Sequence, residues 1–375
     1  MAVHHIDVDP VGARFVDRPH FFPQPGEVGR QDRGRDEWFG HGAAITRITP
    51  ARGNKRPPAL IHTARPALKA DDRVAGLRYA PAVSNPRVSV ICIFFDEERF
   101  LAEAIDSVLA QDFANFELLL VDDGSQDASA QIARDYAARD PQRIRYREHP
   151  AHANRGMSAT RNLGLAAARG EYVAMIDGDD VWEPAKLSQQ VAILDREPEL
   201  GMVCGGYLDW RSWAGGIDAV RIPGPAAPAR TFPPETTLAV YPFGPAQSGT
   251  NALVRRELAL RVGGWEEAFR GFYEDQAFLA KAFLEAGVFW SPQVWFRYRR
   301  HPESCTMNIA EADKRRAAER FIDWFEGYLA RREVPGREAI ERALRARRRD
   351  LRHPLLGKLR RRLRRLLWRP QSIER

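Results

Sequence analysis

Cysteine is scarce in this chain, and long apolar segments are absent. Its 375 residues contain three cysteines (Cys92, Cys204 and Cys305) and no CxxC pair, which argues against a disulfide framework or a structural zinc site. The longest unbroken apolar run, Val90–Phe95, is far shorter than the roughly 20 residues of a membrane-spanning helix. Met1–Pro10 lacks the basic start and apolar core of a secretory signal. We therefore expect a cytoplasmic protein, neither transmembrane nor secreted.

Positive charge is unevenly distributed along the chain. The formal net charge is +7, but residues 336–375 carry +11 and the preceding residues together carry −4. The part of the chain before residue 336 therefore lacks the net positive charge of a nucleic-acid-binding domain, and we expect no nucleic-acid partner.

Composition divides the chain into three parts. The first 87 residues hold ten prolines and eight glycines without sustained periodicity, which predicts a partly irregular extension. Regular patterns begin at residue 88. We expect an extension over 1–87, a main domain over 88–308 with halves 88–180 and 181–308, and C-terminal helices with a basic tail over 309–375.

Apolar runs alternate with helical patterns across the first half of the main domain. This alternation predicts parallel βαβ units and an α/β fold with a mostly parallel central sheet flanked by helices. The Pro-rich segment 205–243 is expected to be an irregular loop. Expected strands are 88–95, 116–121, 143–147 and 171–176; expected helices are 97–110, 128–139, 158–168, 184–195, 273–285 and 311–332.

Carboxylates follow two of these strands. Asp122 and Asp123 end the second strand, and the run Asp177-Gly-Asp179-Asp180 ends the fourth. Parallel strands bring such loops to one sheet edge, where ligands bind. Crowded carboxylates with Asp-x-Asp spacing suit Mg²⁺ or Mn²⁺ shared with phosphate oxygens. The alternative is a pair of solvated turns, since Asp-Gly is a favoured turn pair.

A glycine-containing loop lies between the two acidic ends. It leads into a helix for which Ser158 is the expected cap, and Arg161 adds positive charge near the start of that helix. A helix N-terminus with an added cation suits an anionic phosphate, although an isolated arginine is more often an ordinary surface residue.

Five segments, taken in their order along the chain, resemble family 2 glycosyltransferases of the GT-A fold. They are VSVICIFFDEERFLAEAIDSVLAQDFANFELLLVDDGS, NRGMSATRNLGLAAARGEYVAMIDGDD, GGWEE, YEDQAFLAK and YRRHPES, and the resemblance spans about residues 87–305. It implies an inverting, metal-dependent transfer of a sugar from a nucleotide-sugar donor, with Mn²⁺ or Mg²⁺ as cofactor. It further implies a nucleotide-binding half followed by an acceptor half, and a role in cell-surface polysaccharide or glycolipid assembly.

The resemblance also implies roles for individual residues. The metal would be held by Asp179, Asp177 and His301, and Asp275 would be the general base with Glu274 beside it. A UDP-sugar is the expected donor, and a saccharide or a lipid-linked sugar the expected acceptor. Residues implied on the donor side are Phe95, Asp96, Glu97, Asp122, Asp123, Arg161, Asp177 and Asp179; those on the acceptor side are Trp265, Ser248 and Asn251.

Some features depart from the family pattern or leave alternatives open. Phe95 stands where the family usually has tyrosine, and Asp96 where an amide is usual, so the identity of the base is open. The Gln-x-x-Arg-Trp segment of processive synthases is missing. Glu274 and Asp275 could also simply complement a helix N-terminus. Asp177-x-Asp179 after an apolar strand also suits a haloacid dehalogenase-type phosphohydrolase, and a third alternative is a non-catalytic sugar-nucleotide-binding or membrane-binding protein.

The end of the chain has an amphipathic pattern. Over residues 354–370, leucines fall within one arc of a helix and arginines supply the remaining face, with Trp368 at the border. Such a helix suits an anionic membrane, which would make the enzyme peripheral on the inner face of the cell membrane. Alternatively, the leucines pack on the catalytic domain.

Overall fold

The structure is a computed structural model that describes residues 85–222, 224, 228–240, 251–302, 304 and 310–353. The strands are β1 (Val88–Phe94), β2 (Phe116–Asp122), β3 (Ile144–Glu148), β4 (Tyr172–Asp177), β5 (Val181–Trp182), β6 (Leu200–Trp210), β7 (Ala219–Arg221), β8 (Ala229–Thr231), β9 (Ala252–Arg255) and β10 (Gly287–Arg299). The helices are α1 (Leu101–Leu109), α2 (Ser129–Arg139), α3 (Met157–Ala167), α4 (Lys186–Arg196), α5 (Glu235–Val240), α6 (Arg256–Arg261), α7 (Glu274–Glu285), α8 (Glu311–Ala330) and α9 (Arg337–Arg352), with short 3₁₀ turns at Pro150–His152 and Ser212–Ala214.

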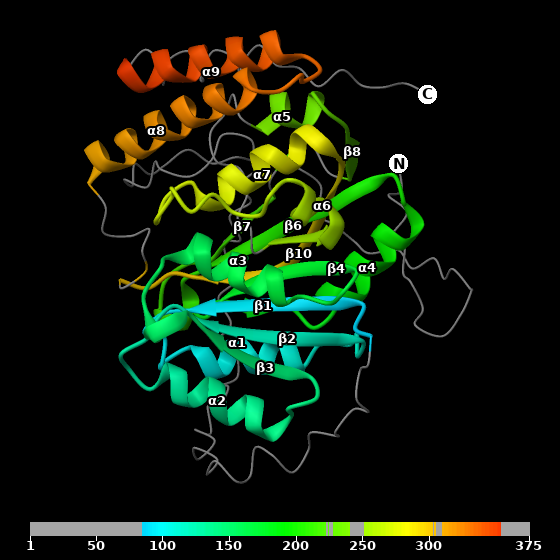
Figure 1. Cartoon of the computed structure of the whole chain (residues 1–375), viewed down its shortest axis with the longest axis vertical. Helices are drawn as coiled ribbons and strands as arrows, with labels where there is room; N and C mark the ends of the chain where they lie inside the picture. Colours follow the sequence, from blue (N-terminus) through cyan, green and yellow to red (C-terminus); the bar gives the residue numbers. More distant parts are fainter. Residues whose placement is uncertain are drawn as a thin grey trace, which may run out of the picture. The chain divides into compact units, whose positions relative to one another are not determined.

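One sheet organises the described part of the chain, in the order β3-β2-β1-β4-β9-β6-β10-β5 (Figure 1). Strands β1 to β4 pair in parallel, as the apolar runs predicted, because each connects to the next through a helix. Strand β9 is antiparallel to both β4 and β6, whereas β6 and β10 are parallel to each other. The sheet is therefore parallel in its first half and mixed in its second.

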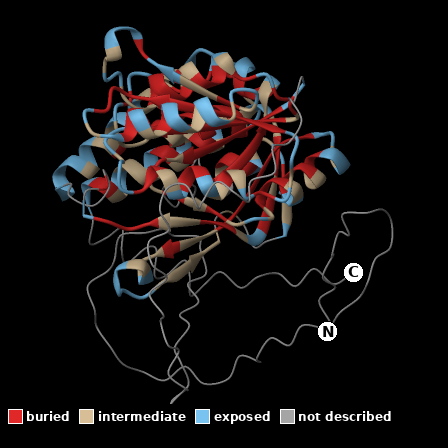
Figure 2. Ribbon diagram, turned by 90° about the horizontal axis from the view of Figure 1, so that it is seen from below, coloured by how far each residue is buried: buried red, intermediate tan, exposed pale blue. Residues whose placement is uncertain are grey.

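Each face of the sheet is covered by its own helices. Side chains of α1 and α4 pack with alternate residues of β1, β2 and β4 on one face. The other face carries α3, α6 and α7, against which α8 and α9 pack. Figure 2 shows the strands buried between helices whose outer surfaces are exposed. Because both faces are covered, the strands read as continuous apolar runs.

The second half of the sheet differs from the sequence expectation. The segment 205–243, expected to be irregular, contains the end of β6 together with β7, β8 and α5. Strands β9 and β10 were not expected at all. Gly205 and Gly206 weaken the strand signal, yet an added Cβ at Gly205 would come within 2.4 Å of the Trp295 ring, so the close packing of β6 requires glycine there.

Helix α3 begins differently from the sequence prediction. Gly156, with a φ of +88°, is its N-cap residue, whereas Ser158 lies inside the helix. The Ser158 hydroxyl donates to the carbonyl of Phe269 at 3.0 Å and so joins α3 to the segment before α7. The prediction that Ser158 caps the helix was therefore wrong.

No helix among the described residues is long and apolar enough to cross a membrane. Almost all of the extension 1–87 and the whole of the amphipathic segment 354–370 lie outside the described residues.

Candidate active site

The strand register brings the acidic loops to one edge of the sheet. Phe94 at the end of β1 pairs with Asp122 of β2, and Ile93 pairs with Asp177 of β4. The loops that follow these three strands therefore leave the sheet side by side, as expected for parallel strands.

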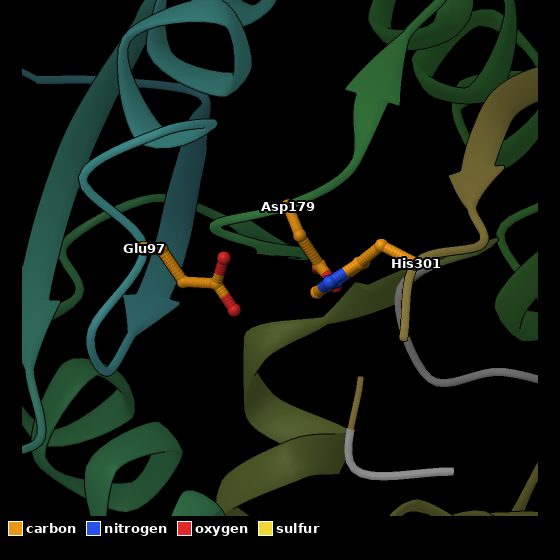
Figure 3. Close-up of side chains that lie close together, drawn as sticks. All are labelled: Glu97, Asp179 and His301. Atoms are coloured by element: carbon orange, nitrogen blue, oxygen red, sulfur yellow. The ribbon is translucent and has the colours of Figure 1, made fainter. Parts of the chain in front are cut away.

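Glu97, Asp179 and His301 meet at this edge, although they come from three distant segments (Figure 3). Each offers one ligand atom, and these atoms all lie within 4.8 Å of one another. His301 Nε2 lies 2.9 Å from an oxygen of Asp179. Burial, together with the negative charge of Asp179, raises the pKa of Glu97 to about 8. Among the described residues, neither carboxylate forms an ion pair with a lysine or an arginine.

This set fits a divalent cation. Two carboxylate oxygens and one imidazole nitrogen suit Mn²⁺ or Mg²⁺, and a bound cation would favour the ionised form of Glu97, whose pKa is raised by burial and by Asp179. The sequence had placed Asp179 and His301 at the metal, but had given Glu97 to the donor. Asp177, the third expected ligand, instead forms an ion pair with Arg161.

Asp177 is held by Arg161. The guanidinium of this buried arginine donates to Asp177 at 2.8 Å and to Glu274 at 3.2 Å. Burial raises the pKa of Asp177 above its ordinary value despite the arginine. Arg161 is 3% exposed, so it acts at the site through these two carboxylates, and its expected contact with a diphosphate stays a prediction.

Glu274 and Asp275 begin helix α7. Burial and the adjacent Asp275 raise the pKa of Glu274 to about 8. Asp275 is partly exposed and accepts a hydrogen bond from the Gln276 amide at 2.7 Å. Tyr273, the residue before them, has a φ of +70°, which an L-residue adopts only when its surroundings impose it. The chain is thus bent so that both carboxylates lie in the first turn of α7.

Asp122 and Asp123 build the loop rather than line a cavity. Asp122 is fully buried; Ser125 donates to one of its oxygens and the Tyr146 hydroxyl lies 2.9 Å from the other. The expected contact of Asp122 with the donor stays a prediction that this burial does not support. Asp123 accepts from the amides of Arg155 and Gly156 at 2.7 to 3.0 Å, which fixes the loop before α3. Its contact with a base stays a prediction.

Phe95 and Asp96 form an exposed turn at the same edge. The Phe95 side chain is 43% exposed, unlike the buried rings of the core. Asp96 has a φ of +55° and is fixed by the Gln126 amide, which donates to its carboxylate at 2.6 Å. An open aromatic face beside a rigid turn is a suitable surface for stacking a base.

Two of the residues expected on the acceptor side are buried. Trp265 is 3% exposed and stacks on Phe278 at a centroid distance of 4.1 Å, so it belongs to the core. Asn251 is fully buried and bonds the Gly205 carbonyl. Both roles stay predictions that this burial does not support, because a lone tryptophan or asparagine in a sequence does not reveal its burial. Ser248 lies outside the described residues.

The sequence analysis did not single out Arg299, which shapes the Asp177–Asp180 loop. Its amide donates to the buried Asp180 at 3.0 Å and its Nε to the Asp179 carbonyl at 2.7 Å. The guanidinium also lies over the Trp210 ring at 4.4 Å. The available signal was the YRRH segment, where Arg299 and His301 alternate along the strand toward the same loop.

Comparisons with known proteins agree with this architecture. The profile of the family described as Glycosyl transferase family 2 matches residues 89–263. The putative glycosyltransferase EpsE of Bacillus subtilis is 33% identical over 204 residues, which cover 52% of this chain and 72% of EpsE. EpsJ of the same organism, an uncharacterized glycosyltransferase, is 42% identical over 123 residues, covering 32% of this chain and 34% of EpsJ.

Solved structures show the same fold. S. aureus TarS 1–349 superposes with a TM-score of 0.50 at 20% identity, covering 69% of this chain and 70% of TarS 1–349. The mannosyltransferase PcManGT of Pyrobaculum calidifontis, in complex with GDP-Man and Mn²⁺, superposes with a TM-score of 0.51 at 21% identity, covering 73% and 72% of the two chains.

The fold and the sequence relatives define an enzyme that transfers sugars. The chain belongs to the family 2 glycosyltransferases and has the GT-A fold, which confirms the resemblance. The alternative of a haloacid dehalogenase-type phosphohydrolase was wrong.

Proposed function

We propose that this glycosyltransferase moves a sugar from a nucleoside-diphosphate donor to an acceptor hydroxyl with inversion, using Mn²⁺ or Mg²⁺. The observation that supports this most is the meeting of Glu97, Asp179 and His301 at the edge that also carries the Phe95 turn. The Mn²⁺ and GDP-Man of the PcManGT complex support the same class of donor and cofactor. A role in cell-surface polysaccharide or glycolipid assembly, and a UDP-sugar as donor, remain part of the proposal.

The chain's own residues divide the work of such a reaction. Glu97, Asp179 and His301 hold the cation, which when bound neutralises charge on the departing diphosphate. Phe95 stacks on the base. Asp275 removes the proton from the acceptor hydroxyl, a role worth about 10²- to 10⁴-fold in rate. Glu274 and Arg161 fix the turn that presents Asp275.

Asp275→Asn tests the proposed base. We expect turnover to fall by at least about 100-fold with donor binding nearly unchanged, because the amide keeps the shape but accepts no proton. Turnover is measured as product formation or, without acceptor, as donor hydrolysis across a panel of UDP- and GDP-sugars with Mn²⁺. Asp313→Asn, in the first turn of α8, is the matched control and leaves both unchanged. Wild-type turnover in Asp275→Asn would remove Asp275 as the base.

The basic tail is proposed to bind an anionic membrane that carries a lipid-linked acceptor. Helix α9 supports this idea, since its exposed arginines (Arg342, Arg345, Arg349 and Arg352) lead toward residues 354–370. A chain ending at His353 is expected to lose sedimentation with phosphatidylglycerol vesicles. Equal sedimentation of both chains would favour packing of the tail on the catalytic domain.

A further inference from the structure

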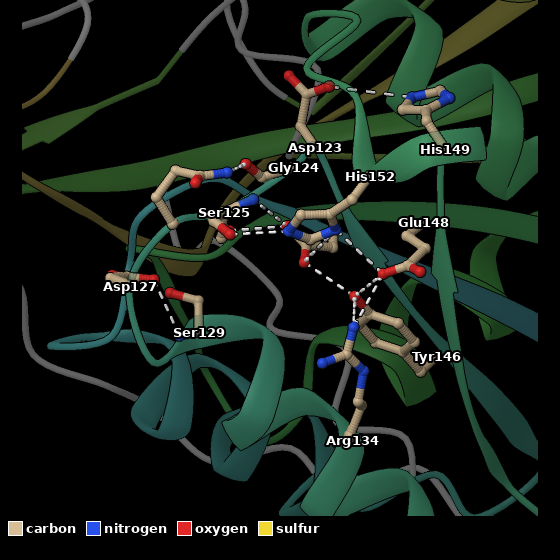
Figure 4. A network of polar contacts seen from close by, with 12 residues as sticks. Asp123, Gly124, Ser125, Asp127, Ser129, Arg134, Tyr146, Glu148, His149 and His152 are labelled. Carbon is tan, nitrogen blue, oxygen red and sulfur yellow. Dashed lines mark hydrogen bonds and ion pairs between the residues drawn. The ribbon is translucent and has the colours of Figure 1, made fainter.

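His152 closes a polar network behind the donor edge (Figure 4). Its Nε2 lies 2.8 Å from the carbonyl oxygen of Ser125, and its Nδ1 lies 3.1 Å from a carboxylate oxygen of Glu148. Both partners are acceptors. A neutral imidazole has one N–H and can satisfy only one of them, whereas an imidazolium satisfies both.

The charges around His152 also favour the imidazolium. The groups that face it are Asp122 from β2, Tyr146 and Glu148 from β3, and Arg134 from α2. With His152 charged, two carboxylates balance two cations. The Ser125 carbonyl first, and then the two carboxylates, raise the pKa of His152 above its ordinary value.

The carboxylates of this cluster already have protein donors. Arg134 donates to Glu148 at 2.9 Å, and Tyr146 shares its hydroxyl between Glu148 at 2.6 Å and Asp122 at 2.9 Å. The oxygens that a cation would need are therefore already bound to protein donors.

His152 acts on the loop that shapes the donor side. His152 contacts the carbonyl of Ser125. The hydroxyl of the same Ser125 accepts a hydrogen bond from the Asp96 amide at 3.1 Å, next to Phe95. An added Cβ at Gly124 would lie 2.7 Å from the His152 carbonyl oxygen, so the two segments touch through their backbones. Ala151 and His152 both have a positive φ, of 58° and 51°, a conformation that the surrounding contacts must maintain.

We propose that His152 is a positioning residue whose imidazolium holds the Asp122–Ser125 loop in the shape that binds the donor, so that donor affinity falls when His152 loses its proton. The inference rests on the proposed use of this edge for the nucleotide. It adds a residue that touches neither donor nor metal and acts through Ser125.

His152→Gln tests this proposed role of His152, which we call the clamp. Glutamine donates one hydrogen bond but carries no charge, so we expect the Kd for UDP or GDP with Mn²⁺ to rise about tenfold at pH 7, as for a small misplacement of a binding group. In the wild type we expect the Kd to rise as the pH rises above the ordinary pKa of histidine, because His152 then loses its proton. In the variant we expect no such rise. Calorimetry between pH 6 and pH 9 measures both. His353→Gln, an exposed histidine at the end of α9, is the matched control.

Glu148→Gln provides a second test if His152→Gln does not fold. Removing the carboxylate charge lowers the pKa of His152, so the rise in Kd moves to lower pH. Identical pH curves for the wild type and either folded variant would overturn the clamp.

NMR titration of the His152 ring separates this inference from the proposed function. If the wild type binds neither nucleotide, the proposed function fails. The clamp still stands if the Ser125 amide shift follows the titration of His152 above pH 6.5, and it is overturned if that shift does not follow.

Discussion

Two clusters of two carboxylates and one histidine lie near the sheet edge that we propose binds the donor, and they differ in their neighbours (Figures 3 and 4). Arg134 and Tyr146 donate to the carboxylates around His152. Among the described residues, no arginine or lysine forms an ion pair with the carboxylate of Glu97 or of Asp179. Identical residue types therefore predict a metal site only where the protein supplies no cation of its own.

The largest effect is expected where an internal cation is removed. Arg161→Met leaves the partly buried Asp177 and the buried Glu274 without their common partner, so the free energy of unfolding falls by about 3 kcal/mol. Urea unfolding measures the change. Arg316→Met, which removes an exposed pair with Asp313, costs under about 0.5 kcal/mol. Equal costs would show that the buried pairing is not needed.

Asp179→Asn tests the cluster without a cation. Because an amide is a poorer ligand than a carboxylate, we expect Mn²⁺-dependent kcat/KM to fall by at least about 100-fold. Titration of activity with Mn²⁺ gives both the rate and the apparent affinity. An unchanged Mn²⁺ dependence would move the metal away from Asp179.

Asp122→Asn makes the corresponding change in the other cluster. It disturbs the contacts with Ser125 and Tyr146, so the free energy of unfolding falls by about 1–3 kcal/mol. The apparent affinity for Mn²⁺ stays at its wild-type value, as measured by the same titration. A loss of Mn²⁺ affinity as large as that of Asp179→Asn would contradict the distinction between the clusters.

The smallest effect is a pH dependence of stability. Because the pKa of Glu274 is raised to about 8, the folded protein keeps a proton that the unfolded chain releases near pH 4.5. The contribution of this group to the free energy of unfolding is therefore present at low pH and is lost as pH rises toward 8. Glu274→Gln removes this dependence, so its Tm falls a few degrees less than that of the wild type between pH 5 and pH 8. Glu338→Gln, an exposed first-turn residue of α9, should behave as wild type.

The first half of the fold was predictable from local patterns. Strands β1, β2 and β4 are buried on both faces, so their sequences are mostly apolar, and the helices of this half keep a regular period. In the second half, β9 has four residues and β6 carries three glycines, so neither gives a clear pattern. Their strand conformation depends on neighbours that are distant in sequence.

The site shows the same division. Asp179 and His301 were expected together, and the structure places them in contact. Glu97 joins them only because α1 is preceded by a loop that returns toward β4, which no local pattern indicates. Trp265 and Asn251 are residue types that are common on sugar-binding surfaces, but tertiary packing buries both side chains.

The sequence by itself determined the family, the parallel half of the sheet and the edge to which the acidic loops run. It could do so because hydrophobic periodicity and motif spacing are local properties of the sequence. Tertiary structure decided which carboxylates receive an arginine or a tyrosine and which form the metal site that we propose. That choice depends on contacts between different elements of the fold, some of them more than a hundred residues apart, such as Arg161 with Glu274 and His301 with Asp179. Burial turns those contacts into differences in charge.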